Sequence, residues 1–164
     1  MATSAHHLSD HDPSSVPDGA GFRLALLVSE WNREVTQALC TGALETLRKY
    51  GVREEDLFLQ WVPGSFELAL AAKQLVSTKG LDGALCLGSI VRGETPHFDY
   101  VCQATALGIM NAGLDLGRPI IFGVLTDDTM EQARDRSGGK HGNKGIDCAV
   151  ALLKMVKLQA EIRG

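Results

Sequence analysis

The stretch that decides the fold is FRLALLV at residues 22–28, a continuous apolar run with the length of a buried β-strand. After it, from Asn32 to Tyr50, apolar side chains recur at helical spacing. Gly51 then ends the expected helix, because glycine readily takes the backbone conformation that closes one. Residues 22–51 therefore predict one β-strand followed by one α-helix.

The same strand-and-helix unit recurs through the rest of the chain. Further strands are expected at 57–62, 83–91 and 119–125, with helices after them at about 65–78, 96–116 and 129–136. A last helix carries one apolar face made of Ile146, Ala149, Val150, Leu153 and Val156. Right-handed crossovers assemble such units into a four-stranded parallel sheet with helices on both faces. Ligands of such sheets gather beyond the carboxyl ends of the strands.

Composition narrows the class of protein. A chain of 164 residues suits one domain, which we assign to residues 21–164, and the polar residues 1–20 are expected to form a mobile tail. The net charge of −4 gives no basic field for nucleic acid. No apolar stretch approaches the roughly 20 residues that cross a bilayer. The expected partner is therefore a small molecule.

The cysteines predict free thiols and no metal site. Cys40, Cys86, Cys102 and Cys148 are too far apart for a CxxC metal motif and lie in apolar runs. Free thiols suit a reducing compartment, and the N-terminal residues lack the basic and apolar regions of a secretory signal. We therefore expect a cytoplasmic protein without a bound metal.

Four loops after the expected strands meet at one edge of the sheet: SEWN (29–32), PGSFE (63–67), RGETPH (92–97) and TDDT (126–129). In the third, Thr95 is expected to cap the next helix and Pro96 to take its first position. Gly93 lets the backbone approach a ligand. Free N–H groups and the helix dipole would then hold a phosphate, unless this is simply a well-capped helix.

Single side chains at this edge suggest proton transfer and stacking. His97 lies in the first helical turn, where the dipole favours the neutral ring, so it is the best acid–base candidate against the alternative of a surface histidine. Trp31 and Phe66 would stack on a planar heterocycle unless they fill the core. Glu67 would accept hydrogen bonds from sugar hydroxyls or simply complement its helix dipole.

The segment RDRSGGKHGNKG (134–145) places basic side chains among glycines. Its composition predicts a flexible loop of the kind that contacts phosphate, although a run of charged residues more commonly forms only a solvated surface. The segment has neither the GxxxxGK[ST] pattern of a P-loop nor the strand-GxGxxG-helix unit of a dinucleotide binder. A nucleotide-binding fold therefore gains no support.

Five short blocks, in this order and at these intervals, resemble the lumazine synthases: VSEWN (28–32), WVPGSFEL (61–68), LGSIVRGETPHFDYV (87–101), IFGVLTDDTMEQA (121–133) and GNKGIDCAV (142–150). The resemblance implies an α/β fold of the flavodoxin-like type, a three-layer sandwich. It also implies the penultimate step of riboflavin biosynthesis, without metal or cofactor. In that step 5-amino-6-(D-ribitylamino)uracil and 3,4-dihydroxy-2-butanone 4-phosphate condense to 6,7-dimethyl-8-ribityllumazine, phosphate and water.

The resemblance further implies roles for individual residues. Trp31 would stack on the pyrimidine ring and His97 would transfer protons. The ring and ribityl chain would be lined by Ser65, Phe66, Glu67, Ser89, Ile90 and Val91, with Asn32 and Lys144 as supporting polar contacts. The butanone phosphate would be received by Gly93, Glu94, Thr95 and, across a subunit boundary, Arg136. Phe122, at the end of the fourth strand, would reach the pocket of the adjacent subunit.

Shared sites imply a homo-oligomer built from pentamers, with a pentamer, a decamer and an icosahedral shell all open, and with riboflavin synthase as a candidate partner. This chain departs from many lumazine synthases in having Glu30 and Trp31 where they have arginine and phenylalanine. Its N-terminal tail also has little strand character to lend to a neighbour. Two rivals are a non-catalytic flavodoxin-like module that binds flavin or a phosphorylated ligand, and a catalytically silent shell protein.

Overall fold

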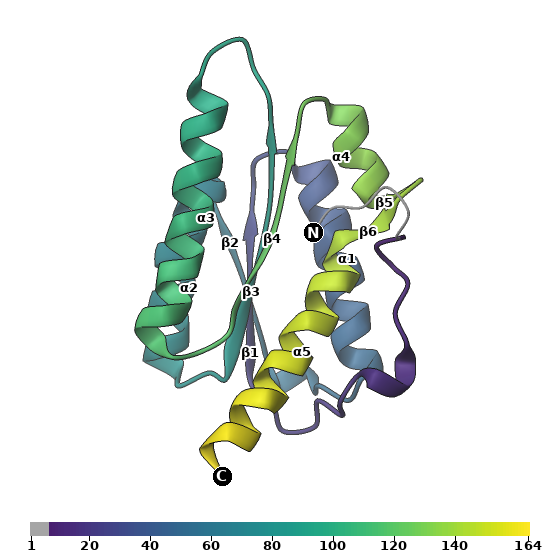
Figure 1. Ribbon diagram of the computed structural model, residues 1–164, viewed down its shortest axis with the longest axis vertical. Coiled ribbons are helices and arrows are strands. Elements are labelled where there is room, and N and C mark those ends of the chain that lie inside the picture. Colours follow the sequence, from purple (N-terminus) through teal and green to yellow (C-terminus); the bar gives the residue numbers. More distant parts are fainter. Residues whose placement is uncertain (1–6) are drawn as a thin grey trace.

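The computed structural model describes residues 7–164 and contains one four-stranded parallel sheet with the strand order β2-β1-β3-β4. Its strands are β1 (Leu24–Ser29), β2 (Leu57–Val62), β3 (Gly83–Val91) and β4 (Ile120–Asp127). Figure 1 shows helices on both sides of the sheet. The predicted three-layer α/β fold of flavodoxin-like type is therefore confirmed.

Two helices cover each face of the sheet. The helices α1 (Arg33–Lys49) and α5 (Lys144–Arg163) pack on one face, and α2 (Leu68–Lys79) and α3 (His97–Leu116) pack on the other (Figure 1). The short helix α4 (Met130–Arg136) follows β4. Single 3-10 turns are η1 (Pro13–Ser15), η2 (Glu54–Asp56) and η3 (Ser65–Glu67).

The central strands are apolar on both sides because both sides are covered. Along β1, Leu24, Leu26 and Val28 pack beneath α1 and α5, whereas Ala25 and Leu27 pack beneath α2 and α3. This alternation follows the two-residue period of a strand. All of β1 is buried, and its residues from Leu24 to Val28 are apolar without interruption. This uninterrupted run is the pattern that predicted a buried strand from the sequence.

Helices α1 and α5 approach each other closely at two glycines. A methyl group on Gly42 would lie 2.7 Å from the side-chain nitrogen of Asn143, and one on Gly145 would overlap the carbonyl oxygen of Leu39. The Asn143 side chain accepts a hydrogen bond from Gly145 N at 2.8 Å and donates to Ala38 O at 2.9 Å. It therefore caps α5 and ties α5 to α1.

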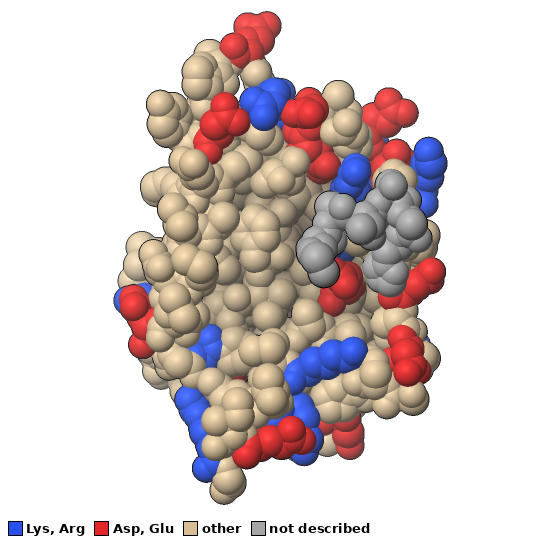
Figure 2. Space-filling view, in the orientation of Figure 1, with Lys and Arg blue, Asp and Glu red and all other residues tan. Residues whose placement is uncertain are grey.

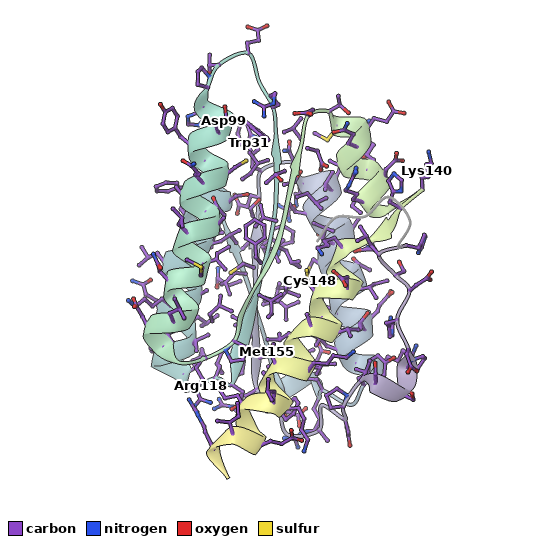
Figure 3. All side chains as sticks on the ribbon, viewed as in Figure 1. Trp31, Asp99, Arg118, Lys140, Cys148 and Met155 are labelled. Carbon is purple, nitrogen blue, oxygen red and sulfur yellow. The ribbon has the colours of Figure 1, made fainter. Side chains whose placement is uncertain are left out.

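The prediction of a flexible basic loop at residues 134–145 is wrong. Its first residues complete α4, and the rest form a small antiparallel hairpin of β5 (Ser137–Gly139) and β6 (Gly142–Asn143) before α5 begins. Arg134 binds both carboxylate oxygens of Glu34 on α1, with distances of 2.9 and 3.1 Å. Lys144 pairs with Asp147. Lys140, at the hairpin tip, projects away from the body (Figure 3).

The described part of the polar N-terminal segment lies against this hairpin and against α1 and α5. Leu8 N donates to His141 O at 2.8 Å, and the Ser9 hydroxyl accepts from Asn143 N at 3.0 Å. A hydrogen bond of 2.7 Å joins His11 Nε2 to the Tyr50 hydroxyl. Residues 1–6 of the expected tail lie outside the described residues, and its mobility stays a prediction.

Between residues 7 and 164, no helix has both the length and the apolarity needed to span a membrane.

Candidate active site

A pocket of about 450 Å³ opens at the carboxyl edge of the sheet, where three of the four predicted loops meet. Its lining comes from the loops after β1, β2 and β3, from the end of β3 and from the first turns of α3. The lining residues are Trp31, Gly64, Ser65, Phe66, Ser89, Ile90, Val91, Gly93, Thr95, His97, Phe98 and Val101. The structure thus brings together residues that lie up to about 70 positions apart in the chain.

Trp31 forms one side of the pocket, and its backbone is held by the residue that follows it. Asn32 has a φ of 56°, the left-handed conformation that asparagine tolerates better than most side chains. Its side-chain nitrogen donates to Ser89 O at 3.0 Å, which fixes the β1–α1 loop to β3. Trp31 is 71% exposed and Phe66 is 62% exposed, so neither aromatic fills the core. Both present ring surface that a planar ligand would cover.

Two serine hydroxyls behind the pocket wall have no hydrogen-bond partner among residues 7–164. The side chains of Ser65 and Ser89 are both buried. Gly88 leaves the space for Ser65, because a methyl group there would lie 2.5 Å from its Oγ. A buried polar atom without a partner is costly. Both oxygens are shielded from solvent, so they belong to the buried wall behind the pocket and not to its open surface.

His97 is the first residue of α3 and faces both the pocket and an adjoining surface hollow. That hollow is also lined by Phe66, Glu67 and Tyr100. The predicted helix start is wrong in one respect, since Pro96 takes the cap position and no side chain caps the helix. Thr95 therefore keeps its side chain free of the helix and lines the pocket instead. Figure 3 shows Trp31 and the first turn of α3, marked by Asp99, at the same end of the molecule.

Sequence reasoning missed the contribution of Gly64, Phe98 and Val101 to the pocket. Phe98 and Val101 lie one helical turn apart on α3, so the apolar spacing after His97 was an available signal. Arg92 was missed as well. Its guanidinium carbon lies 4.1 Å from the centroid of the Phe98 ring, and the side chain pairs with Asp99 and Asp128. The hydrogen bond to Asp128 raises the pKa of Arg92.

Several predicted site residues do not line the pocket of their own chain. Glu94 is exposed in the loop before α3, Glu67 faces the adjoining hollow, and Lys144 is tied to Asp147. Phe122 is the third residue of β4, so the prediction that it ends the strand is wrong. It is 37% exposed, and β4 is an edge strand of the sheet.

Arg136 lies at the end of α4, away from the pocket lining. Its Nη1 is 3.6 Å from Asp127 Oδ1 and donates to Gln132 O at 3.0 Å. Burial raises the pKa of Asp127, and the charge of Arg136 offsets part of that effect. The second oxygen of the Asp127 carboxylate is buried without a hydrogen-bond partner. Arg136 is therefore held beside the buried Asp127 carboxylate, and its positive charge offsets only part of the cost of burying that carboxylate.

Within the described residues, no group of three or more histidine, cysteine, aspartate or glutamate side chains is placed to hold a metal ion. The four cysteines are free thiols, and burial raises the pKa of Cys86 to about 12. The polar groups that line the pocket are therefore an exposed imidazole, the Thr95 side chain and the backbone of the loop before α3.

Comparison with known proteins identifies relatives over nearly the whole chain. A family model described as 6,7-dimethyl-8-ribityllumazine synthase matches residues 21–160. A curated 6,7-dimethyl-8-ribityllumazine synthase from Parabacteroides distasonis is 49% identical over 160 residues, which cover 98% of this chain and all of the relative. Relatives of the same name from Porphyromonas gingivalis and Lactiplantibacillus plantarum are each 48% identical and cover 97% and 88% of this chain, and 99% and 91% of their own length.

Proposed function

The chain belongs to the 6,7-dimethyl-8-ribityllumazine synthase family, and we propose that its enzymatic reaction takes place in the pocket between Trp31 and His97. In this reaction, 5-amino-6-(D-ribitylamino)uracil condenses with 3,4-dihydroxy-2-butanone 4-phosphate. The products are 6,7-dimethyl-8-ribityllumazine, phosphate and water, and the step is part of riboflavin biosynthesis. Family membership favours this enzyme over a flavodoxin-like module that only binds a flavin.

The observation that carries the proposal is the composition of one pocket wall. An exposed indole and an imidazole at a helix start line the same space of about 450 Å³, together with the end of β3 at Ser89, Ile90 and Val91. The indole suits the flat pyrimidinedione, and the segments at Ser65 and Ser89, which line the pocket, suit its polar edge or the ribityl chain. The loop at Gly93, Glu94 and Thr95, ahead of the positive end of α3, suits the phosphate.

In the proposed mechanism, the ring amine attacks the ketone of the butanone phosphate and water leaves as an imine forms. His97 then removes a proton from the butanone carbon chain, and the phosphate group leaves with its bonding electron pair. The enol left by loss of phosphate takes up a proton and becomes a ketone, the ribitylamino nitrogen attacks its carbonyl carbon, and a second water leaves as the ring closes. Holding both substrates at one wall supplies most of the acceleration through orientation, and proton transfer by His97 supplies the rest.

We propose that a second subunit completes each pocket. Phe122 is exposed on the edge strand β4, and Arg136 lies outside the pocket of its own chain, so both are available to a neighbour. Figure 2 shows that the middle of the molecular face over the β4 edge carries almost no charged side chains. A groove near this face is lined mainly by apolar side chains, with Arg118, Gln159 and Arg163 among them, and Met155 and Arg118 are marked in Figure 3. Its large apolar residues are Met110, Leu114, Ile120, Ile121, Met155, Leu158 and Ile162. An exposed apolar surface of this kind is typical of an oligomer interface.

The assembly is proposed to be built from pentamers, and riboflavin synthase remains a candidate partner of that assembly. The free thiols support a cytoplasmic location, since a reducing compartment keeps cysteines unpaired. Residues 21–164 are proposed as the single catalytic domain, a span supported by the family match at 21–160. Light scattering on the purified protein separates a pentamer from a decamer and from an icosahedral shell.

The function is tested by incubating the protein with both substrates and following the absorbance of the lumazine. A His97→Ala variant should lose turnover by about 100-fold while keeping its circular dichroism spectrum, because a positioned acid–base group contributes roughly that much. Near-normal turnover in that folded variant would remove His97 from proton transfer. Absence of lumazine formation by the unmodified protein would refute the function itself.

A further inference from the structure

Arg92 lies where β3 ends and the loop before α3 begins, and three groups engage its guanidinium. Its Nε donates to Asp128 Oδ1 at 2.7 Å, and its Nη1 donates to Asp99 Oδ1 at 3.3 Å. The planar face lies over the Phe98 ring at 4.1 Å. Asp128 follows β4, and Asp99 lies in the first turn of α3. One side chain therefore joins the two segments beside the loop at 93–95.

The charge balance around this loop disfavours anions. Residues 92–99 and 126–129 contain four carboxylates, at positions 94, 99, 127 and 128, and Arg92 is their only arginine or lysine. Each unpaired carboxylate would repel an incoming phosphate dianion. Arg92 pairs with two of the four, and Asp127 lies beside Arg136. Without Arg92, two neighbouring negative charges would stand uncompensated.

We propose that Arg92 is a positioning residue for the phosphorylated substrate: it neutralises Asp99 and Asp128 and so keeps the loop before His97 able to receive an anion. This inference rests on the proposed function, which places the butanone phosphate at that loop. Arg92 is not the phosphate ligand in this arrangement, because carboxylates take up its Nε and Nη1 and Phe98 covers one face.

Three roles for Arg92 predict different results in a variant series. If Arg92 masks charge, removing the two carboxylates should repair the loss of the arginine. If Arg92 binds phosphate directly, removing the carboxylates cannot replace it. If Arg92 only ties segments together, its loss should impair both substrates and turnover alike, since the whole pocket wall would loosen.

The experiment measures KM for each substrate and kcat in the full-length assembled protein. Arg92→Gln should raise KM for the butanone phosphate about tenfold, with kcat and KM for the pyrimidinedione within about twofold. Adding Asp99→Asn and Asp128→Asn should return that KM to within about threefold of the unmodified value. The defect of Arg92→Gln should also shrink at about 0.5 M salt, since salt screens charge repulsion between exposed groups.

Arg48→Gln is the matched control. Arg48 also forms an exposed two-point pair, with Glu54 at 2.7 and 2.9 Å, and it lies on α1 away from the pocket. This variant should leave both KM values unchanged. Titration of inorganic phosphate by calorimetry repeats the series without turnover, and the same order of affinities is expected.

An unchanged KM for the butanone phosphate in Arg92→Gln overturns the proposal. So does a triple variant no better than Arg92→Gln, or an equal loss in every kinetic parameter with an intact circular dichroism spectrum. If the unmodified protein makes no lumazine, the proposed function fails, and the phosphate titrations then decide on Arg92 alone.

Discussion

Replacing Trp31 with alanine should weaken binding of the pyrimidinedione without affecting the fold. A tryptophan side chain offers roughly 250 Å² of surface, and 71% of Trp31 is exposed, which leaves about 180 Å² open. A flat ring that covers one face would remove about 90 Å² of it from water. At about 25 cal/mol per Å² this contributes about 2 kcal/mol, or about 30-fold in affinity.

The assay uses the only two tryptophans of the chain, Trp31 and Trp61. Trp61 packs against the core beneath α1 and α5, with Arg33 over its ring at 4.6 Å. In a Trp61→Phe protein, Trp31 is therefore the single tryptophan and reports on the pocket by its fluorescence. Quenching of that signal by the pyrimidinedione gives its Kd directly. In Trp31→Ala, KM for the pyrimidinedione should rise about 30-fold while Tm stays within about 2 °C. An unchanged KM in the folded variant would refute the stacking role, and a lost fold would contradict the prediction that the fold does not depend on Trp31.

Three further predictions concern packing, pH and phosphate. Gly145→Ala should lower Tm by roughly 4 to 8 °C in a thermal melt, because the new methyl group overlaps the Leu39 carbonyl and overpacking costs about 2 kcal/mol; an unchanged Tm would show that α1 and α5 separate freely. Burial raises the pKa of Asp127 above 3.8, so its carboxylate weakens the fold increasingly as pH rises through that raised pKa, and the penalty is absent below 3.8. Asp127→Asn should therefore gain stability relative to the unmodified protein between acidic and neutral pH in urea titrations, and a pH-independent difference would contradict this. Arg136→Ala should raise KM for the butanone phosphate by about 10- to 100-fold with little change in Tm, since a charge-assisted hydrogen bond contributes about 1.5 to 3 kcal/mol; an effect on the pyrimidinedione alone would place Arg136 elsewhere.

The strands and long helices were predictable because each is dominated by a short-range pattern. The apolar run at 22–28 marks a buried central strand, and β1 indeed has no exposed residue. The edge at which the ligand pocket lies also followed from the parallel order of the strands. Trp31, Phe66 and His97 could be placed at that edge before their side-chain contacts were known.

The elements that were predicted wrongly depend on contacts between residues distant in the sequence. Residues 137–143 read as a loop from their glycines, yet the preceding Arg134 pairs with Glu34, which lies 100 positions earlier. No local pattern reports such a pair. The cap predicted at Thr95 failed because local capping rules do not include the pocket that this residue lines. Arg92 was missed since its two carboxylates come from different segments.

His97 lines the pocket of its own chain and Arg136 does not, which has a genetic consequence if neighbouring subunits complete each pocket as proposed. A chain that has lost its histidine still offers an intact arginine to the next chain, and the reverse also holds. Two inactive alleles expressed together would therefore recover part of the activity in mixed assemblies. Conversely, a chain from one damaged allele would impair both its own pocket and the pocket of a neighbour. The loss of activity would therefore depend on how the chains assemble and not only on the fraction of damaged chains.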